Sequence, residues 1–170
     1  MIQKYSDLRV LEVFFKEPTS THFIREISRE IKLAPTSVRI IVDNLSKQEL
    51  IKSKKSKPFD GYAANRENDA FLFYKRACNI LSLYELRDLI IEAIHPSSIA
   101  LFGSYSRGED VETSDIDILV ISKIKKELKF PELEKKLKRK INIMVVESLK
   151  KLDSLIIKKI YNILICNITL

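Results

Sequence analysis

Two short stretches decide the fold: Ala100–Gly108, which reads Ala-Leu-Phe-Gly-Ser-Tyr-Ser-Arg-Gly, and Thr113–Val120, which reads Thr-Ser-Asp-Ile-Asp-Ile-Leu-Val. Two of the only 3 glycines in the chain lie in the first stretch, next to an apolar run. In the second stretch, Asp115 and Asp117 stand on a run of apolar residues that predicts a strand. Residues two apart on a strand point to the same face, so both carboxylates project together. Two like charges this close repel unless a divalent cation lies between them, which predicts a site for phosphate-bound Mg²⁺ or Mn²⁺.

The glycine turn supplies groups that suit an anion. Gly103 has no Cβ, so the backbone can turn sharply and bring its N–H groups close to a phosphate. Ser104 offers a hydroxyl, and Arg107 offers a planar cationic fork. Together with the two aspartates, these residues predict a site for ATP or another nucleoside triphosphate with its metal. The alternative interpretation is a surface turn followed by an acidic strand end.

The pattern Gly103–Gly108 followed by Ser114–Asp117 resembles the minimal nucleotidyltransferase family of the DNA polymerase β superfamily. The resemblance implies that Gly103 and Ser104 hold the triphosphate. It also implies that Asp115 and Asp117 bind the metal, and that Arg107 contacts phosphate.

The third carboxylate of that family is missing from its expected place. The family has an acidic residue in the middle of the next strand, and this chain has Asn142 there, within Lys140–Glu147. An amide carries no charge and cannot act as a base, so Asn142 is a degenerate catalytic position. Glu147 could replace it only if a bulge turned the strand, because five residues along an ideal strand lie on the opposite face. We therefore expect nucleotide binding with weakened or absent transfer.

Apolar residues recur at helical spacing in the first half of the chain. They predict a helix around Leu8–Phe15, a second helix capped by Thr21, and a third that begins at Pro35. The segment from Leu50 to Ala64 then predicts a hairpin with a lysine-rich tip.

This order of three helices and a hairpin, over roughly residues 5 to 65, resembles the winged helix-turn-helix of prokaryotic transcription regulators. The resemblance implies double-stranded DNA as a partner, with the third helix in the major groove and the wing on phosphate. The residues placed to face bases are Thr36, Ser37, Arg39, Ile40 and Asn44, and those placed to meet phosphate are Lys54, Lys55 and Lys57. A protein-docking module with a solvated basic hairpin is the alternative.

We thus predict an α+β chain with an N-terminal winged helix-turn-helix over residues 1–66, linking helices over 67–95, and a nucleotidyltransferase-like domain over 96–170. The linking segment carries the aromatic residues Phe71, Phe73 and Tyr74, which predict a seam between domains or a homodimer contact. The second domain is expected to be a small mixed sheet with strands at 98–102, 116–121 and 141–146. Its predicted helices are 84–94, 131–138 and 149–162, and an apolar run follows at 163–168.

Charge and cysteine content narrow the class of protein. The net charge of +7 and the pI near 9.3 favour an anionic partner. The basic run Lys123–Lys140 is mostly a solvated face, with nucleic acid or an acidic protein as possible partners. Cys78 and Cys166 have no zinc-ligand spacing, and no secretory leader or membrane-spanning segment is evident, which predicts reduced thiols in a cytoplasm.

Three functions compete. The first is a DNA-binding transcriptional regulator whose second domain binds nucleotide and Mg²⁺. The resemblance to minimal nucleotidyltransferases suggests a specific case of this function, the antitoxin of a HEPN-type toxin. The second is an active nucleotidyltransferase that moves AMP to a hydroxyl of a protein, an RNA or a small molecule; Asn142 counts against it. The third is a DNA-binding protein whose second domain only dimerises, and the Asp115–Asp117 pair counts against it.

Overall fold

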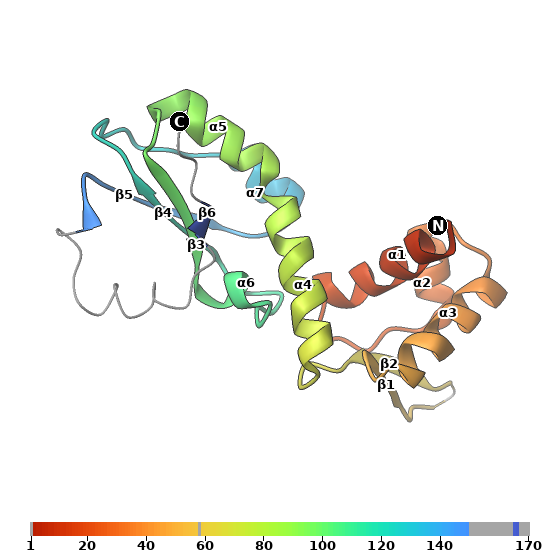
Figure 1. The fold of residues 1–170 in the computed structure, drawn as a ribbon. Coiled ribbons are helices and arrows are strands. Elements are labelled where there is room, and N and C mark those ends of the chain that lie inside the picture. The colour runs from red at the N-terminus through yellow and green to blue at the C-terminus, as the bar shows by residue number, and fades with distance from the viewer. Residues whose placement is uncertain (1, 58, 150–164, 167–170) are drawn as a thin grey trace. The chain divides into compact units, whose positions relative to one another are not determined.

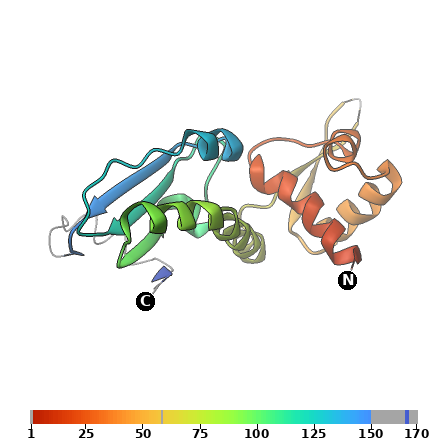
Figure 2. The ribbon, with the colours of Figure 1, turned by 90° about the horizontal axis from the view of Figure 1, so that it is seen from above.

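The computed structural model describes residues 2–57, 59–149 and 165–166. The chain divides into two compact units, Met1–Lys75 and Arg76–Leu170, and the division falls within helix α4 (Asp69–Ser82). Figures 1 and 2 show the elements of each unit from two directions. Among the described residues, no helix has both the length and the apolar character needed to cross a membrane.

The first unit contains three helices that pack on one another: α1 (Ile2–Lys16), α2 (Ile24–Ile31) and α3 (Pro35–Lys47). The predicted helices are thus present. Val10, Phe14, Ile27, Val38 and Val42 are all fully buried, so one apolar stripe of each helix forms the core.

The predicted start of α2 at Thr21 is wrong. The helix begins at Ile24, and the Glu26 carboxylate accepts a hydrogen bond from the backbone N–H of Phe23, which occupies the N-cap position. Thr21 and His22 lie before the helix, because His22 exchanges two backbone hydrogen bonds of 2.8 Å with Tyr62 of the hairpin. A third extended segment next to the hairpin therefore precedes the helix.

The hairpin consists of β1 (Ile51–Lys54) and β2 (Gly61–Ala64), which are antiparallel with Lys54 opposite Gly61. Phe71 of α4 is buried and packs edge to face against Phe15, with ring centroids 5.1 Å apart. Of the three aromatic residues predicted to form a seam or dimer contact, Phe71 therefore belongs to the core of the first unit. Phe73 and Tyr74 are exposed.

The second unit is a mixed four-stranded sheet in the order β5-β4-β3-β6. Strand β3 (Ser98–Phe102) runs antiparallel to β4 (Ile116–Ile121) and to β6 (Ile165–Cys166), whereas β5 (Ile141–Val146) runs parallel to β4. The helices are α5 (Tyr84–Ile94), α6 (Gly103–Arg107) and α7 (Pro131–Leu137). The predicted mixed sheet with helices is confirmed. The predicted helix at 149–162, apart from its first residue Leu149, and the predicted run at 163–168, apart from β6, lie outside the described residues.

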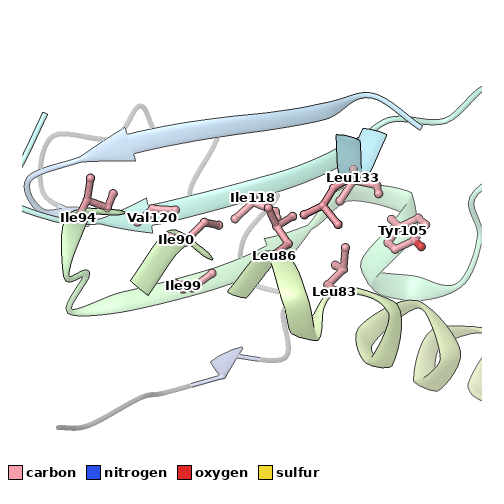
Figure 3. Packing of buried hydrophobic residues seen from close by; sticks show 10 residues of the cluster. Leu83, Leu86, Ile90, Ile94, Ile99, Tyr105, Ile118, Val120 and Leu133 are labelled. Carbon is pink, nitrogen blue, oxygen red and sulfur yellow. The ribbon is translucent and has the colours of Figure 1, made fainter. Parts of the chain in front are cut away.

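One face of this sheet forms the core of the second unit (Figure 3). Leu86, Ile90 and Ile94 recur every four residues on α5 and pack against the alternate residues of β4 that include Ile118 and Val120. Burial of each such side chain stabilises the fold by about 1.5–3 kcal/mol. Because Ile116, Ile118 and Val120 point into this core, Asp117 projects from the opposite face.

Candidate functional site

The turn after β3 brings the backbone against an aspartate. Gly103 has a φ of +76°, a conformation that costs little only for glycine. A Cβ on Gly103 would lie 2.6 Å from Oδ2 of Asp117, closer than any real side chain allows. Phe102 pairs with Asp117 in the ladder of β3 and β4, which fixes this approach. Glycine at this position therefore lets the carboxylate lie directly beside the turn.

Helix α6 follows the turn and carries Ser104 and Arg107. Ser106 Oγ donates a hydrogen bond of 2.8 Å to the carbonyl oxygen of Gly103, which holds the first turn of the helix. Ser104 lies in that turn and is half-buried. Arg107 is exposed, and its Nε donates to Oε2 of Glu109 at 2.7 Å. An exposed pair of this kind contributes little stability, so the guanidinium can exchange this partner for a phosphate.

Asp115, Asp117 and Asn142 meet at the ends of two neighbouring strands. Asp117 and Asn142 are partners in the parallel ladder of β4 and β5, and Asp115 immediately precedes β4. Nδ2 of Asn142 donates to Oδ2 of Asp115 at 3.2 Å and to Oδ1 of Asp117 at 3.1 Å. The amide N–H groups thus offset part of the repulsion between the carboxylates. The cluster therefore has two acids and one amide, and within the described part of the chain no group of three or more His, Cys, Asp or Glu side chains is placed to hold a metal ion.

A groove of about 740 Å³ opens beside this cluster. Asp117 and Asn142 line it, together with residues of β5, Phe130, two lysines (Lys126 and Lys129) and two glutamates (Glu127 and Glu134). The site therefore borders a groove whose lining carries side chains of both charges beside apolar ones.

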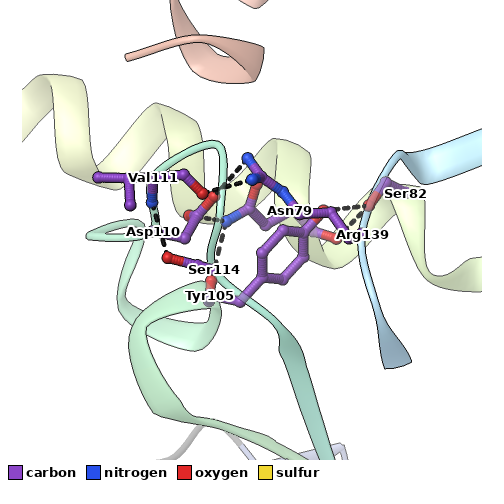
Figure 4. Close-up of polar contacts among 7 residues, drawn as sticks. All are labelled: Asn79, Ser82, Tyr105, Asp110, Val111, Ser114 and Arg139. Carbon is purple, nitrogen blue, oxygen red and sulfur yellow. Dashed lines mark hydrogen bonds and ion pairs between the residues drawn. The ribbon is translucent and has the colours of Figure 1, made fainter. Parts of the chain in front are cut away.

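A buried polar network supports the loop between α6 and β4 (Figure 4). Asn79 Nδ2 donates to Oδ1 of Asp110 at 2.7 Å and to the carbonyl oxygen of Tyr105 at 2.9 Å. Arg139 forms an ion pair of 3.4 Å with Asp110 and donates to the carbonyl oxygen of Val111. The network ties α4, the loop and the segment just before β5 together, and the loop that it holds lies between Gly103 and Asp115 in the sequence.

Sequence reasoning missed this network. Asp110 and Arg139 are 29 residues apart, and each reads as a surface charge within a charged run. Their side chains are only 0% and 7% exposed, so the solvated face predicted for Lys123–Lys140 does not include Arg139. Tyr105 closes the network through a 3.0 Å hydrogen bond with Ser82. Burial raises the pKa of the Tyr105 phenol above its ordinary value.

Asp110→Ala should lower the free energy of unfolding of the second unit by about 3–5 kcal/mol, because it leaves the Arg139 charge buried without this partner. Urea denaturation followed by circular dichroism measures the change. The matched control is Glu127→Ala, which removes the exposed Lys129–Glu127 pair and should cost less than about 1 kcal/mol. Equal effects of the two substitutions would show that the network does not support the loop.

The residues predicted to bind DNA lie on the surface of the first unit. Thr36, Ser37 and Arg39 are exposed on α3, Ile40 is 58% exposed, and Asn44 is half-buried. Lys54, Lys55 and Lys57 are exposed in the hairpin. Sequence reasoning overlooked Phe59 in the same hairpin, although it is 68% exposed.

Comparison with known proteins bears on the second unit. Residues 83–166 match the family model described as "Nucleotidyltransferase domain". The chain is also similar to a protein of Methanocaldococcus jannaschii, named "Putative protein adenylyltransferase MJ1215", with 57% identity over 49 residues. That similarity covers 28% of this chain and 57% of the relative, so the chain spans little more than half of the relative's length. No solved structure matches significantly. The second unit therefore contains a nucleotidyltransferase-type domain.

Proposed function

We propose that the cluster at the end of β4 and β5 binds a nucleoside triphosphate such as ATP together with Mg²⁺. The observation that carries this proposal is the convergence of the Asp115 and Asp117 carboxylates, whose oxygens lie within 3.2 Å of one Asn142 nitrogen. Carboxylate oxygens are the protein ligands that Mg²⁺ prefers. Gly103, whose missing Cβ leaves room beside Asp117, and Ser104 would then approach the triphosphate.

The donor set fits a divalent cation. Asp115 and Asp117 would hold it, and rotation of the Asn142 amide would present its carbonyl oxygen in place of its N–H group. Bound there, the cation would neutralise charge on the phosphates and orient them. Calorimetric titration with ATP in the presence of Mg²⁺ tests the proposal, and EDTA should remove the heat of binding.

Asn142 weakens transfer in this proposal. It carries no negative charge and cannot accept a proton from an attacking hydroxyl, so the chain binds nucleotide well and reacts slowly. Arg107 remains available as a phosphate contact once it leaves Glu109.

The second candidate is an active enzyme that transfers AMP to a protein hydroxyl. The name of the Methanocaldococcus jannaschii relative favours this candidate, because that protein is described as a protein adenylyltransferase. Incorporation of label from α-labelled ATP into an acceptor protein distinguishes the two candidates.

For the first unit, we propose a winged helix-turn-helix that binds double-stranded DNA. The exposed polar face of α3 and the three exposed lysines of the hairpin support it. A DNA-binding unit joined to a nucleotide-binding unit suits a transcriptional regulator. The specific case that we propose is an antitoxin that pairs with a HEPN-type toxin and controls its own operon. A neighbouring gene for a small helical protein with an Arg-x₄-His motif would support the pairing.

Replacing Lys54, Lys55 and Lys57 together with alanine should weaken binding to all DNA sequences. Each lost phosphate contact should also reduce the slope of log K against log salt by about one unit. Fluorescence anisotropy with the upstream region of the gene, measured at several salt concentrations, gives both quantities. An unchanged slope would remove the hairpin from the DNA interface.

The matched variants are Arg39→Ala and Asn44→Ala, which should change sequence preference more than salt dependence. Wild-type affinity and preference in both variants would contradict DNA reading by α3.

A further inference from the structure

The hairpin of the first unit carries an exposed aromatic ring near its tip. Strand β1 ends at Lys54, which pairs with Gly61 at the start of β2, so residues 55–60 form the connection between the strands. Phe59 lies in this connection and is 68% exposed. An aromatic ring in water loses the free energy that burial would give it, so Phe59 contributes little to the core of its own unit. The ring is therefore available to a partner.

The base of the hairpin is fixed to the rest of the first unit. His22, in the extended segment before α2, exchanges two backbone hydrogen bonds of 2.8 Å with Tyr62 of β2. A Cβ on Gly61 would lie 2.4 Å from Cγ2 of Thr21, so the same segment packs closely against the start of β2. Figures 1 and 2 show the hairpin extending from this base, away from the helices. A fixed base reduces the entropy that Phe59 loses when it binds a partner.

The charge around Phe59 is positive. Residues 52–60 contain four lysines and one acid, Asp60, whose Oδ1 accepts a 3.3 Å hydrogen bond from the backbone N–H of Ser56. Lys52 pairs with Glu67 at 2.7 Å. The other three lysines are exposed, and no ion pair engages them within the described part of the chain: Lys54, Lys55 and Lys57. Lysines for phosphates beside a ring for bases are typical of nucleic-acid binding.

We propose that Phe59 inserts its ring between two base pairs of double-stranded DNA from the minor groove, while the lysines of the tip contact the adjacent phosphates. This inference rests on the DNA binding proposed above for the first unit, and it adds a residue that deforms the duplex. Apolar wedges of this kind partially unstack one base step and kink the DNA. The lysines contact phosphate in any sequence, whereas the wedge makes affinity depend on how easily a step unstacks. Phe59 is thus a specificity-determining residue.

Double-stranded DNA explains more of the first unit than an anionic lipid surface does. A lipid surface would also accept an apolar ring with lysines around it. It would leave unused the polar side chains that α3 exposes in the same unit, Thr36, Ser37 and Arg39. A duplex offers phosphates and base edges to those side chains as well as to the hairpin.

The wedge predicts a sequence preference. TA steps unstack easily, whereas A-tracts are stiff. Two duplexes of about 25 base pairs, identical in composition and flanks, carry TTTAAA or AAATTT at the centre, and only the first has a central TA step. The full-length protein should bind the TTTAAA duplex about fivefold more tightly or better, measured by fluorescence anisotropy. Equal affinities for the two duplexes would overturn the wedge.

Phe59→Ala should weaken binding to the TTTAAA duplex by about tenfold or more and abolish the preference. The slope of log K against log salt should stay as in the wild type, because no charge is lost. Phe59→Leu keeps an apolar wedge and should retain most of the affinity. The matched control is Phe73→Ala, which removes a 67% exposed ring from α4 and should have no effect. Unchanged affinity in Phe59→Ala, or an equal loss in Phe73→Ala, would contradict the site.

The deformation of the DNA is measurable with the wild-type protein itself. 2-Aminopurine in place of an adenine of the central TA step fluoresces more strongly when its stacking is disrupted. Dyes on the two ends of the duplex transfer energy more efficiently when the duplex kinks. Both signals should rise when the wild-type protein binds, and both should stay near those of free DNA with saturating Phe59→Ala. Absence of both changes with the wild type would overturn the wedge.

Two other partners of the tip are outcomes of the same test. Tighter binding of one strand than of the duplex, with the same dependence on Phe59, would overturn the wedge in favour of single-stranded nucleic acid. Phe59-dependent binding to phosphatidylserine vesicles, without binding to either duplex, would overturn DNA in favour of a lipid surface.

The wedge and the proposed DNA binding fail in different ways. If the wild type and Phe59→Ala bind both duplexes equally, with the salt dependence expected from the lysines, DNA binding stands and the wedge alone fails. If the wild type binds neither duplex at low salt, the function proposed for the first unit fails and the wedge fails with it.

Discussion

Mg²⁺-dependent binding of ATP should be lost when Asp115 and Asp117 are both replaced with asparagine, with the affinity falling by about 100-fold or more. The two carboxylates are the only charged side chains that meet Asn142 among the described residues, and each charged contact contributes about 1.5–3 kcal/mol. Asparagine has nearly the same shape as aspartate, so the substitution removes charge and not volume. Isothermal titration calorimetry with ATP and Mg²⁺ measures the loss.

The matched control is Asp88→Asn on α5, where the exposed carboxylate pairs with the neighbouring Arg87 at 2.8 Å. This variant should bind ATP and Mg²⁺ as the wild type does. Retention of Mg²⁺-dependent binding by the double variant would show that the nucleotide lies elsewhere.

Much of this site could be predicted from the sequence because its parts are local. Asp115 and Asp117 are two residues apart, so the period of a strand alone places them on one face. Gly103 is one of 3 glycines in the chain, and a glycine after an apolar run indicates a sharp turn. The place of Asn142 follows from the spacing of the next strand. These inferences need no knowledge of distant contacts.

Other features depend on contacts between distant segments and could not be predicted in this way. The bond of the Asn142 amide to both carboxylates depends on the register of β4 and β5, which pairs Asp117 with Asn142 across two strands that are distant in sequence. The ion pair of Asp110 with Arg139 joins residues from two charged runs. Thr21 carries a good capping side chain, yet the pairing of His22 with Tyr62 moves the helix start to Ile24.

The neutral amide of Asn142 also has an energetic consequence. Without a cation, its N–H groups lie between two negative charges and stabilise the cluster. A third carboxylate in the same place would add repulsion that only bound cations could offset. The wild-type cluster is therefore better adapted to the metal-free state than a cluster of three acids.

Asn142→Asp should make the cluster favour the cation-bound state, and it should give the largest gain in transfer activity that we expect from one substitution. The third charge should strengthen binding of Mn²⁺, measured by electron paramagnetic resonance, and an aspartate can accept the proton of an attacking hydroxyl. A general base typically contributes about 10²–10⁴-fold, so transfer should rise by at least about 100-fold. The measurement is incorporation of label from α-labelled ATP into the small helical protein of the neighbouring gene, where one is present.

The matched variant is Asn142→Ala, which removes the amide without adding charge. It should bind ATP and Mg²⁺ no better than the wild type and should show no transfer, because two carboxylates can hold the cation that accompanies the triphosphate but leave the hydroxyl without a base. Robust labelling by the wild-type protein that is lost in Asn142→Ala would lead to the opposite conclusion. The amide would then suffice for transfer, and the chain would be an active adenylyltransferase with asparagine in the third position.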